Sequence, residues 1–171
     1  MLYNSVNFGS HIWLGNFCSG RLTLRNSTLG TGVFHFENLT SYGGTATSTV
    51  DQAVGWFDAS TVMVSRCAVG GDPDYGAANG KFTFTNGSLL TLSRKPTWQN
   101  KPGLYIGYSG GKQYTSTVTV AGSRVENTFN TVVGYDNDRG KGRLTFSENA
   151  VGLLNSNVTL GVNNLSYGCL H

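Results

Sequence analysis

Equal intervals between glycines restrict the fold of this chain more than any other feature of its sequence. Gly107 and Gly134 are 27 residues apart, and Gly134 and Gly161 are again 27 residues apart. Each glycine ends a short apolar run, and a loop and then a triplet of alternating residues follow it. A fixed period of roughly 20 to 50 residues is typical of repeat architectures, in which each unit buries its apolar face against the next unit. The run that ends at Gly15 shows the same pattern, and looser copies are expected at Gly55 and Gly70.

The triplets after the loops predict short strands with one apolar side. In residues 118–120 the two valines point to one side and Thr119 to the other, because side chains alternate along a strand. The apolar members therefore face a core, while Thr23, Thr83, Thr119 and Thr145 form an outward ladder. The expected triplets are residues 22–24, 62–64, 82–84, 118–120 and 144–146, with a last copy at 169–171. We also expect Val132, Leu144 and Phe146 to be buried.

A third apolar stretch follows each triplet, so each repeat contains three short strands separated by turns. This pattern predicts an all-β fold, a right-handed parallel β-solenoid (β-helix) of about six coils of roughly 27 residues. An antiparallel sandwich is the alternative, but it gives no reason for the same glycine to recur. We expect one domain, residues 1–171, with irregular insertions near residues 40–50 and 93–102.

The two ends of the chain carry no obvious capping segment. Solenoids normally end in capping units, because an open coil leaves backbone donors and acceptors without partners. We therefore expect a fragment of a longer repeat protein. End-to-end self-association through uncapped coils is the less favoured alternative.

The composition excludes several classes of protein. Charged residues make up only 12% of the chain, about half of the usual share of roughly 25%, and 24 of the 171 residues are glycine. Long helices with charged outer faces are therefore excluded. The 12 lysines and arginines form no run of three, which argues against a nucleic-acid partner. No apolar run reaches about 18 residues and no signal peptide is evident, so we expect no membrane span.

Three runs in the second half of the chain resemble a known family. They are LYIGYSGG (104–111), TSTVTVAGSRVENT (115–128) and TVVGYDNDRGKGRLTFSENAVGLLN (131–155). These runs, within about residues 103–171, resemble the passenger β-helix repeats of bacterial autotransporters. The resemblance implies a non-catalytic structural or adhesive segment of a bacterial exported protein, extracellular or at the cell surface. It also implies a glycan or protein of a host or cell surface as the partner.

Two loops carry matching acidic residues. Asp72 and Asp74 match Asp136 and Asp138, because each pair follows a repeat glycine with the spacing Asp-x-Asp-x-Gly. Alternating carboxylates suit calcium, which takes about 6–8 oxygen ligands. The same residues also build ordinary turns, and the loops after Gly107 and Gly161 carry no acid. We favour turns and retain calcium as the one candidate cofactor.

An enzyme is the alternative to a scaffold. A carbohydrate-binding or polysaccharide-degrading β-helix of the tailspike or lyase type would place acids in a cleft on one sheet. The acids of this chain are spread over different parts of the repeat, and its three histidines share no catalytic motif. We therefore expect no catalytic residue and no enzymatic activity.

Two tyrosines and three cysteines complete the candidate residues. Tyr108 and Tyr135 each follow a repeat glycine, so we expect them to stack one coil apart. Such a stack serves as a binding surface for sugars or proteins, or as lateral packing. Cys18, Cys67 and Cys169 show no metal-binding spacing, and their odd number leaves at least one thiol free. The sequence leaves their pairing open.

Overall fold

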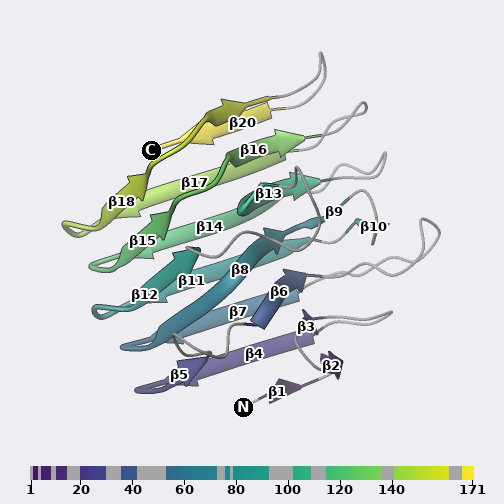
Figure 1. The fold of residues 1–171 in the computed structure, drawn as a ribbon, viewed down its shortest axis with the longest axis vertical. Helices are drawn as coiled ribbons and strands as arrows, with labels where there is room; N and C mark the ends of the chain where they lie inside the picture. The colour runs from purple at the N-terminus through teal and green to yellow at the C-terminus, as the bar shows by residue number, and fades with distance from the viewer. Residues whose placement is uncertain are drawn as a thin grey trace.

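The fold is all-β. The computed structural model describes residues 2–3, 5–8, 11–14, 20–29, 36–41, 53–72, 76–77, 79–92, 102–108, 115–135, 141–161 and 167–171. These residues form strands and turns, and none of them is helical (Figure 1). The strands are stacked along the long axis of the molecule, from the N-terminal end to the C-terminal end (Figure 1).

Sheet A is a seven-stranded sheet that runs the length of this stack. Its order is β1 (Leu2–Tyr3), β4 (Gly20–Arg25), β7 (Ala53–Asp58), β11 (Gly80–Thr85), β14 (Thr115–Ala121), β17 (Lys141–Ser147) and β20 (Tyr167–Leu170). Since the strands follow one another in sequence order, each new passage of the chain adds one strand to the same edge.

The second large sheet has two arms that share the long strand β8 (Thr61–Val69). Arm B contains β2 (Ser5–Phe8), β3 (His11–Leu14), β6 (Phe36–Ser41), β13 (Leu104–Tyr108), β16 (Thr131–Tyr135) and β19 (Val158–Leu160). Arm C contains β5 (Thr28–Leu29), β12 (Leu89–Leu92), β15 (Arg124–Asn127) and β18 (Val151–Leu154). Two further strands, β9 (Gly71–Asp72) and β10 (Gly76–Ala77), pair with each other.

From β4 onward, apart from the short β9–β10 pair, the chain visits sheet A, arm C and arm B in a constant order, and neighbouring passages pair in parallel. Leu104 lies opposite Thr131, and Thr131 lies opposite Val158, which is the 27-residue interval of the sequence. The expectation of an all-β fold with parallel sheets is therefore confirmed. The antiparallel sandwich is wrong, since antiparallel pairing within the described strands is confined to β1–β4, β2–β3 and β9–β10.

The repeat glycines lie at one corner, where arm B ends. Gly70, Gly107, Gly134 and Gly161 have φ values of +101°, +86°, +77° and +65°. A side chain at a positive φ is strained, which explains why glycine recurs there. The predicted equivalence of the last three positions is confirmed by the register of β13, β16 and β19.

A column of small residues in sheet A packs against this corner. In register order it contains Gly20, Ala53, Gly80, Ser116, Gly142 and Gly168. A Cβ added to Gly142 would lie 2.5 Å from the carbonyl oxygen of Ile106 and 2.6 Å from the nitrogen of Gly134. At Gly142, the backbones of sheet A and arm B therefore approach each other too closely to leave room for a side chain.

The second passage of the chain differs from the predicted repeat. Gly55 lies in the middle of β7, between Leu22 and Phe82, so its expected place among the corner glycines is wrong. A Cβ at Gly55 would lie 2.9 Å from ring atoms of both Phe57 and Phe82, so this glycine makes room for aromatic rings. The triplet at residues 62–64 is also misassigned, because β8 pairs with β5 and β12 in arm C. The insertions expected near residues 40–50 and 93–102 fall mostly on residues 42–50 and 93–101, outside the described residues.

The core lies between sheet A and the second sheet. Phe57 stacks on Phe84 with a centroid distance of 4.5 Å and contacts Phe82 edge-on at 5.8 Å. Leu144 is buried in this core as expected, and Val132 is buried in a separate small cluster with Ala68 and Tyr105. Phe146 is only partly buried, so its expected burial is wrong. The reason is its position near the C-terminal end of the stack, where β20 pairs only with residues 141–144 of β17.

The two ends of the stack differ. At the N-terminal end, β1 runs antiparallel along β4 and β2 runs antiparallel along β3, so the expectation of an uncapped first coil is wrong. The outermost strands at the other end carry exposed large apolar side chains, namely Val151, Leu153, Val158, Leu160 and Leu170. End-to-end self-association stays a prediction.

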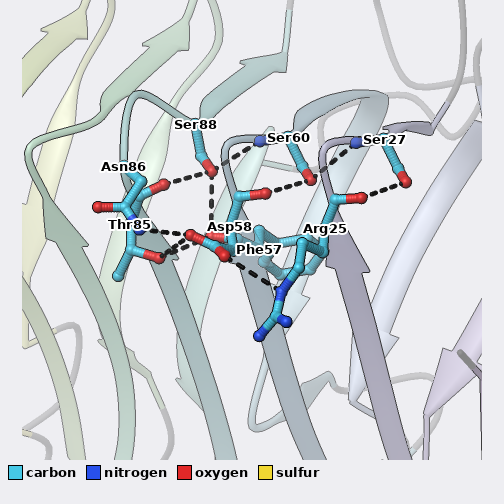
Figure 2. Close-up of polar contacts among 8 residues, drawn as sticks. All are labelled: Arg25, Ser27, Phe57, Asp58, Ser60, Thr85, Asn86 and Ser88. Atoms are coloured by element: carbon cyan, nitrogen blue, oxygen red, sulfur yellow. Dashed lines mark hydrogen bonds and ion pairs between the residues drawn. The ribbon is translucent and has the colours of Figure 1, made fainter.

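A ladder of four serines holds the turn between sheet A and arm C. Figure 2 shows three of them, Ser27, Ser60 and Ser88. The backbone N–H of Ser27 donates to Ser60 Oγ, that of Ser60 to Ser88 Oγ, and that of Ser88 to Ser123 Oγ, at 3.0–3.2 Å. Each hydroxyl also lies within hydrogen-bond distance of a carbonyl oxygen at the end of a sheet A strand. The ladder therefore satisfies buried backbone groups of successive passages.

We expect Ser88→Ala to lower the free energy of unfolding by about 1–3 kcal/mol, because it leaves the buried N–H of Ser60 without an acceptor. Ser27→Ala is the matched control, since Ser27 is exposed and its hydroxyl donates to the carbonyl of Arg25. The control should cost less than about 1 kcal/mol. Urea unfolding measures both values, and equal losses for the two variants would contradict the ladder.

Candidate binding face

Sheet A presents its polar side chains outward in columns. Because neighbouring strands are parallel and in register, side chains at equivalent positions lie one above another. One column contains Arg21, Val54, Lys81, Thr117 and Arg143, and the next contains Thr23, Trp56, Thr83, Thr119 and Thr145. The predicted outward placement of Thr119 and Thr145 in neighbouring parallel strands is confirmed.

The outer face of sheet A is strongly cationic. It carries five exposed basic side chains, namely Arg21, Arg25, Lys81, Lys141 and Arg143. Among the described residues of sheet A, Asp58 is the single acid. An excess of one sign of charge on one face attracts partners of the opposite sign.

Asp58 is bound by three neighbours at the edge of this face (Figure 2). Arg25 Nε lies 3.3 Å from Asp58 Oδ2, while Asn86 Nδ2 and Thr85 Oγ1 donate to Oδ1 at 2.5 and 3.3 Å. The Arg25 side chain is 62% exposed and that of Asp58 is 16% exposed. Asp58 therefore orients Arg25 at the surface and has few lone pairs left for other chemistry.

Trp56 is the aromatic centre of the face. Its side chain is 37% exposed, and the guanidinium of Arg25 lies over its ring, 5.2 Å from the centroid. A shallow depression of about 460 Å³ surrounds it, lined by Arg21, Thr23, Val54, Trp56, Lys81 and Thr83. An exposed aromatic beside cations and hydroxyl groups is a combination that suits a polar ligand with an apolar face.

Most of the residues in the two predicted calcium-binding loops lie outside the described residues. Asp72 ends β9, and Asp74, Asp136 and Asp138 lie outside the described residues. No group of three acids, histidines or cysteines that could hold a metal is found within the described residues. The calcium site and the alternative of ordinary turns both stay predictions.

We expect the melting temperature to be the same with millimolar calcium and with excess chelator, because the favoured turns need no ion. Differential scanning calorimetry on one protein preparation measures both conditions. A rise of several degrees with calcium, reversed by chelator, would contradict this expectation, since a ligand of the folded state raises stability by mass action.

The predicted tyrosine pair is partly confirmed. Tyr108 of β13 lies opposite Tyr135 of β16 in the parallel register, so the two positions are one passage apart. Tyr108 is half-buried and packs against the cluster of Ala68, Tyr105 and Val132. This packing favours the lateral role of Tyr108 over the predicted ligand-binding role, which stays untested.

The cationic face was missed by the sequence interpretation. A search for runs of basic residues finds nothing, because the cations of the face lie on different strands or are separated along one strand by uncharged residues. Lys81 and Arg143, for example, are 62 residues apart in the chain but two strands apart in sheet A. The sequence does carry a signal for this column. When the triplets are aligned, the residue that lies on the outer side just before each triplet is basic in three of them, at Arg21, Lys81 and Arg143.

The two described cysteines differ in burial. Cys67 is fully buried in β8, and this burial raises the pKa of its thiol from 9.0 to about 12, against the smaller opposing effect of Arg66. Cys169 is half-buried, and its Sγ lies 2.9 Å from Nε2 of His171. Both are free thiols, while Cys18 lies outside the described residues.

We expect a thiol reagent at pH 8 to modify Cys169 in the folded protein and to leave Cys67 unmodified until the chain unfolds, because only the thiolate reacts. The raised pKa also makes folding stability fall between pH 9 and about 12, where the unfolded state loses this proton first. Mass spectrometry of labelled peptides checks the first result. Rapid labelling of native Cys67 would contradict it.

Comparison with known proteins supplies no relative. No family model, no curated protein and no solved structure matches the chain. Among the described residues, no helix is long and apolar enough to cross a membrane.

Proposed function

We propose that this chain is a right-handed parallel β-solenoid that serves as a non-catalytic structural and adhesive segment of a bacterial exported or cell-surface protein. The proposal rests first on the regular stacking of successive passages in parallel register. A crossover between parallel strands of one sheet is right-handed in about 98% of cases, which supports the hand. The resemblance of residues 103–171 to autotransporter passenger repeats supports the extracellular setting.

The observation that carries the adhesive role is the outer face of sheet A. Its five exposed cations, its exposed Trp56 and its threonine column lie on a regular sheet that many backbone hydrogen bonds hold in place. A site on rigid strands needs little ordering when a partner binds, so less of the binding free energy is lost. A repetitive, elongated partner would meet equivalent side chains at regular intervals.

The same face supports a non-catalytic role. Acid–base cleavage of a glycosidic bond requires a pair of carboxyl groups on either side of it. The described part of sheet A offers only Asp58, and hydrogen bonds and an ion pair already engage that carboxylate. The polysaccharide-degrading alternative is therefore less well supported than adhesion.

Retention and cleavage assays on the same polysaccharides test this function. The purified chain is passed over immobilised acidic and neutral polysaccharides, and the same polymers are incubated with it in solution. We expect retention on at least one polymer with no change in polymer length by size-exclusion chromatography. Shortening of any polymer would contradict the non-catalytic role and would support the polysaccharide-degrading alternative. Absence of retention on every polymer and on host-cell surfaces would overturn adhesion.

A further inference from the structure

We propose that the outer face of sheet A binds an acidic polysaccharide whose chain runs along the stack and carries a carboxylate on every second sugar. This inference rests on the proposed adhesive function and names its ligand class and site. The site comprises Arg21, Lys81 and Arg143 in one column, with Trp56 and Arg25 beside it.

The charge of the face selects an anion. Five exposed basic residues face one acid, and that acid is already paired with Arg25 and with Asn86. Within the described strands of sheet A, no acid lies opposite Lys81, Lys141 or Arg143. A neutral ligand gains no charge–charge attraction from these cations, whereas a polyanion contacts several of them at once.

The spacing of the cations selects a polysaccharide with alternating charge. In the column, one uncharged residue separates successive cations, since Val54 lies between Arg21 and Lys81, and Thr117 between Lys81 and Arg143. The cations therefore recur every second strand, about 9.6 Å apart. A sugar in an extended chain advances by about one strand spacing, so a polymer with one carboxylate in each disaccharide matches this interval.

Trp56 supplies the second contact that such a chain needs. The C–H face of a sugar ring packs on an exposed aromatic ring, and hydroxyl groups around it find hydrogen-bond partners. Trp56 lies in the threonine column between Thr23 and Thr83, and it lines the depression together with Arg21 and Lys81. A sugar over Trp56 would therefore place its acidic neighbours near the cations on either side.

Nucleic acid fits the same face less well. Phosphates on a nucleic-acid strand recur about every 3.4 Å along a duplex, which is much denser than this column of cations. Binding of a single strand also uses several aromatic platforms for successive bases. Among the side chains of this face whose exposure the structure describes, Trp56 is the one exposed aromatic residue.

Binding of a hyaluronan decasaccharide tests the proposal, because hyaluronan has one carboxylate in each disaccharide. Dextran is the neutral comparison and an oligo-dT of similar length is the nucleic-acid comparison. Titration calorimetry at about 100 mM salt measures the three affinities, so that charge screening is moderate. We expect hyaluronan to bind, dextran not to bind, and oligo-dT to bind more weakly than hyaluronan.

The variant Lys81→Gln/Arg143→Gln removes two cations of the column, and we expect it to weaken hyaluronan binding about tenfold. Arg124→Gln is the matched control, because Arg124 is an exposed cation of arm C that is paired with Glu126. The control should change the affinity less than about twofold, and circular dichroism establishes that both variants are folded.

Three results would overturn the inference. They are absence of hyaluronan binding, tighter binding of oligo-dT than of hyaluronan, and equal affinity of the double variant and the unmodified protein. In each case the adhesive function survives if the chain is retained on another polymer or on cell surfaces. If retention fails everywhere, the proposed function fails as well, so the two failures are distinguishable.

Discussion

Replacing Gly107 by alanine is expected to destabilise the protein by about 2–5 kcal/mol in total. Gly107 has a φ of +86°, and a Cβ there would lie 2.5 Å from the carbonyl oxygen of Lys141. A left-handed conformation costs an alanine roughly 1–2 kcal/mol. Forcing the backbones of β13 and β17 apart costs about 1–3 kcal/mol more, since no flexible side chain can move aside.

Substitutions at two further glycines measure separately the free-energy cost of the positive φ and that of the backbone clash. Gly87 has a φ of +76° but open space around its Cα, so Gly87→Ala should cost only the conformational term, about 1–2 kcal/mol. Gly142 has no positive φ, and Gly142→Ala isolates the clash with Ile106 and Gly134. Denaturant unfolding measures the three losses of free energy. A Gly107→Ala loss no larger than that of Gly87→Ala would contradict the close approach of sheet A and arm B.

Replacing Phe57 by alanine is expected to cost about 3–5 kcal/mol, because it empties the centre of the core. Phe57 is fully buried, and its ring contacts both Phe82 and Phe84. The neighbouring Gly55 carries no side chain that could fill the cavity, and the strands on both sides hold β7 in register.

Trp56→Ala is the control for this variant, since Trp56 is the next residue of the same strand but points outward and is 37% exposed. Its replacement removes a larger side chain and should still cost less than about 1.5 kcal/mol. Thermal and urea unfolding of the two variants gives the comparison. A larger loss for Trp56→Ala than for Phe57→Ala would reverse the assignment of the inner and outer faces of sheet A.

The sequence predicted the parallel stacking in the second half of the chain because two independent signals coincided there. The positive φ at Gly107, Gly134 and Gly161 demands glycine, and the strand period demands alternating apolar residues. Both conditions recur at the same interval, and the resulting register matches the observed pairing of β13, β16 and β19.

The first half was less predictable, since its strands meet the same physical requirements with different residues. In β7 the small inward residue is Gly55 and the outward residue is Trp56, so this strand lacks the threonine of the other triplets. The pattern search therefore assigned residues 62–64 to the wrong sheet. It also missed the capping pairs of β1 and β2, because two to four residues are too few to show a period.

The candidate site could not be predicted from local motifs. Lys81 and Thr117 are neighbours in sheet A at a separation of 36 residues, while Thr117 and Arg143 are neighbours at 26. Unequal intervals hide a column of cations from any fixed-period search. The acidic loops attracted attention in the sequence because Asp-x-Asp-x-Gly is a local pattern, whereas the face of sheet A exists only through pairing of distant strands.

A distance measurement between Thr23 and Thr145 tests the central claim, the stacking of successive passages in parallel register. The two residues lie in one column, with Trp56, Thr83 and Thr119 between them. Spin labels are attached to the variant Thr23→Cys/Thr145→Cys, in which Cys18 and Cys169 are replaced by serine. Pulsed electron paramagnetic resonance then gives the distance between the two labels. Buried Cys67 stays in place, because its raised pKa protects it from labelling. Four strand spacings predict about 19 Å between the Cα atoms, and a single distance near this value is the expected result. A separation above about 30 Å, or a broad distribution without a main peak, would contradict the stack of parallel strands.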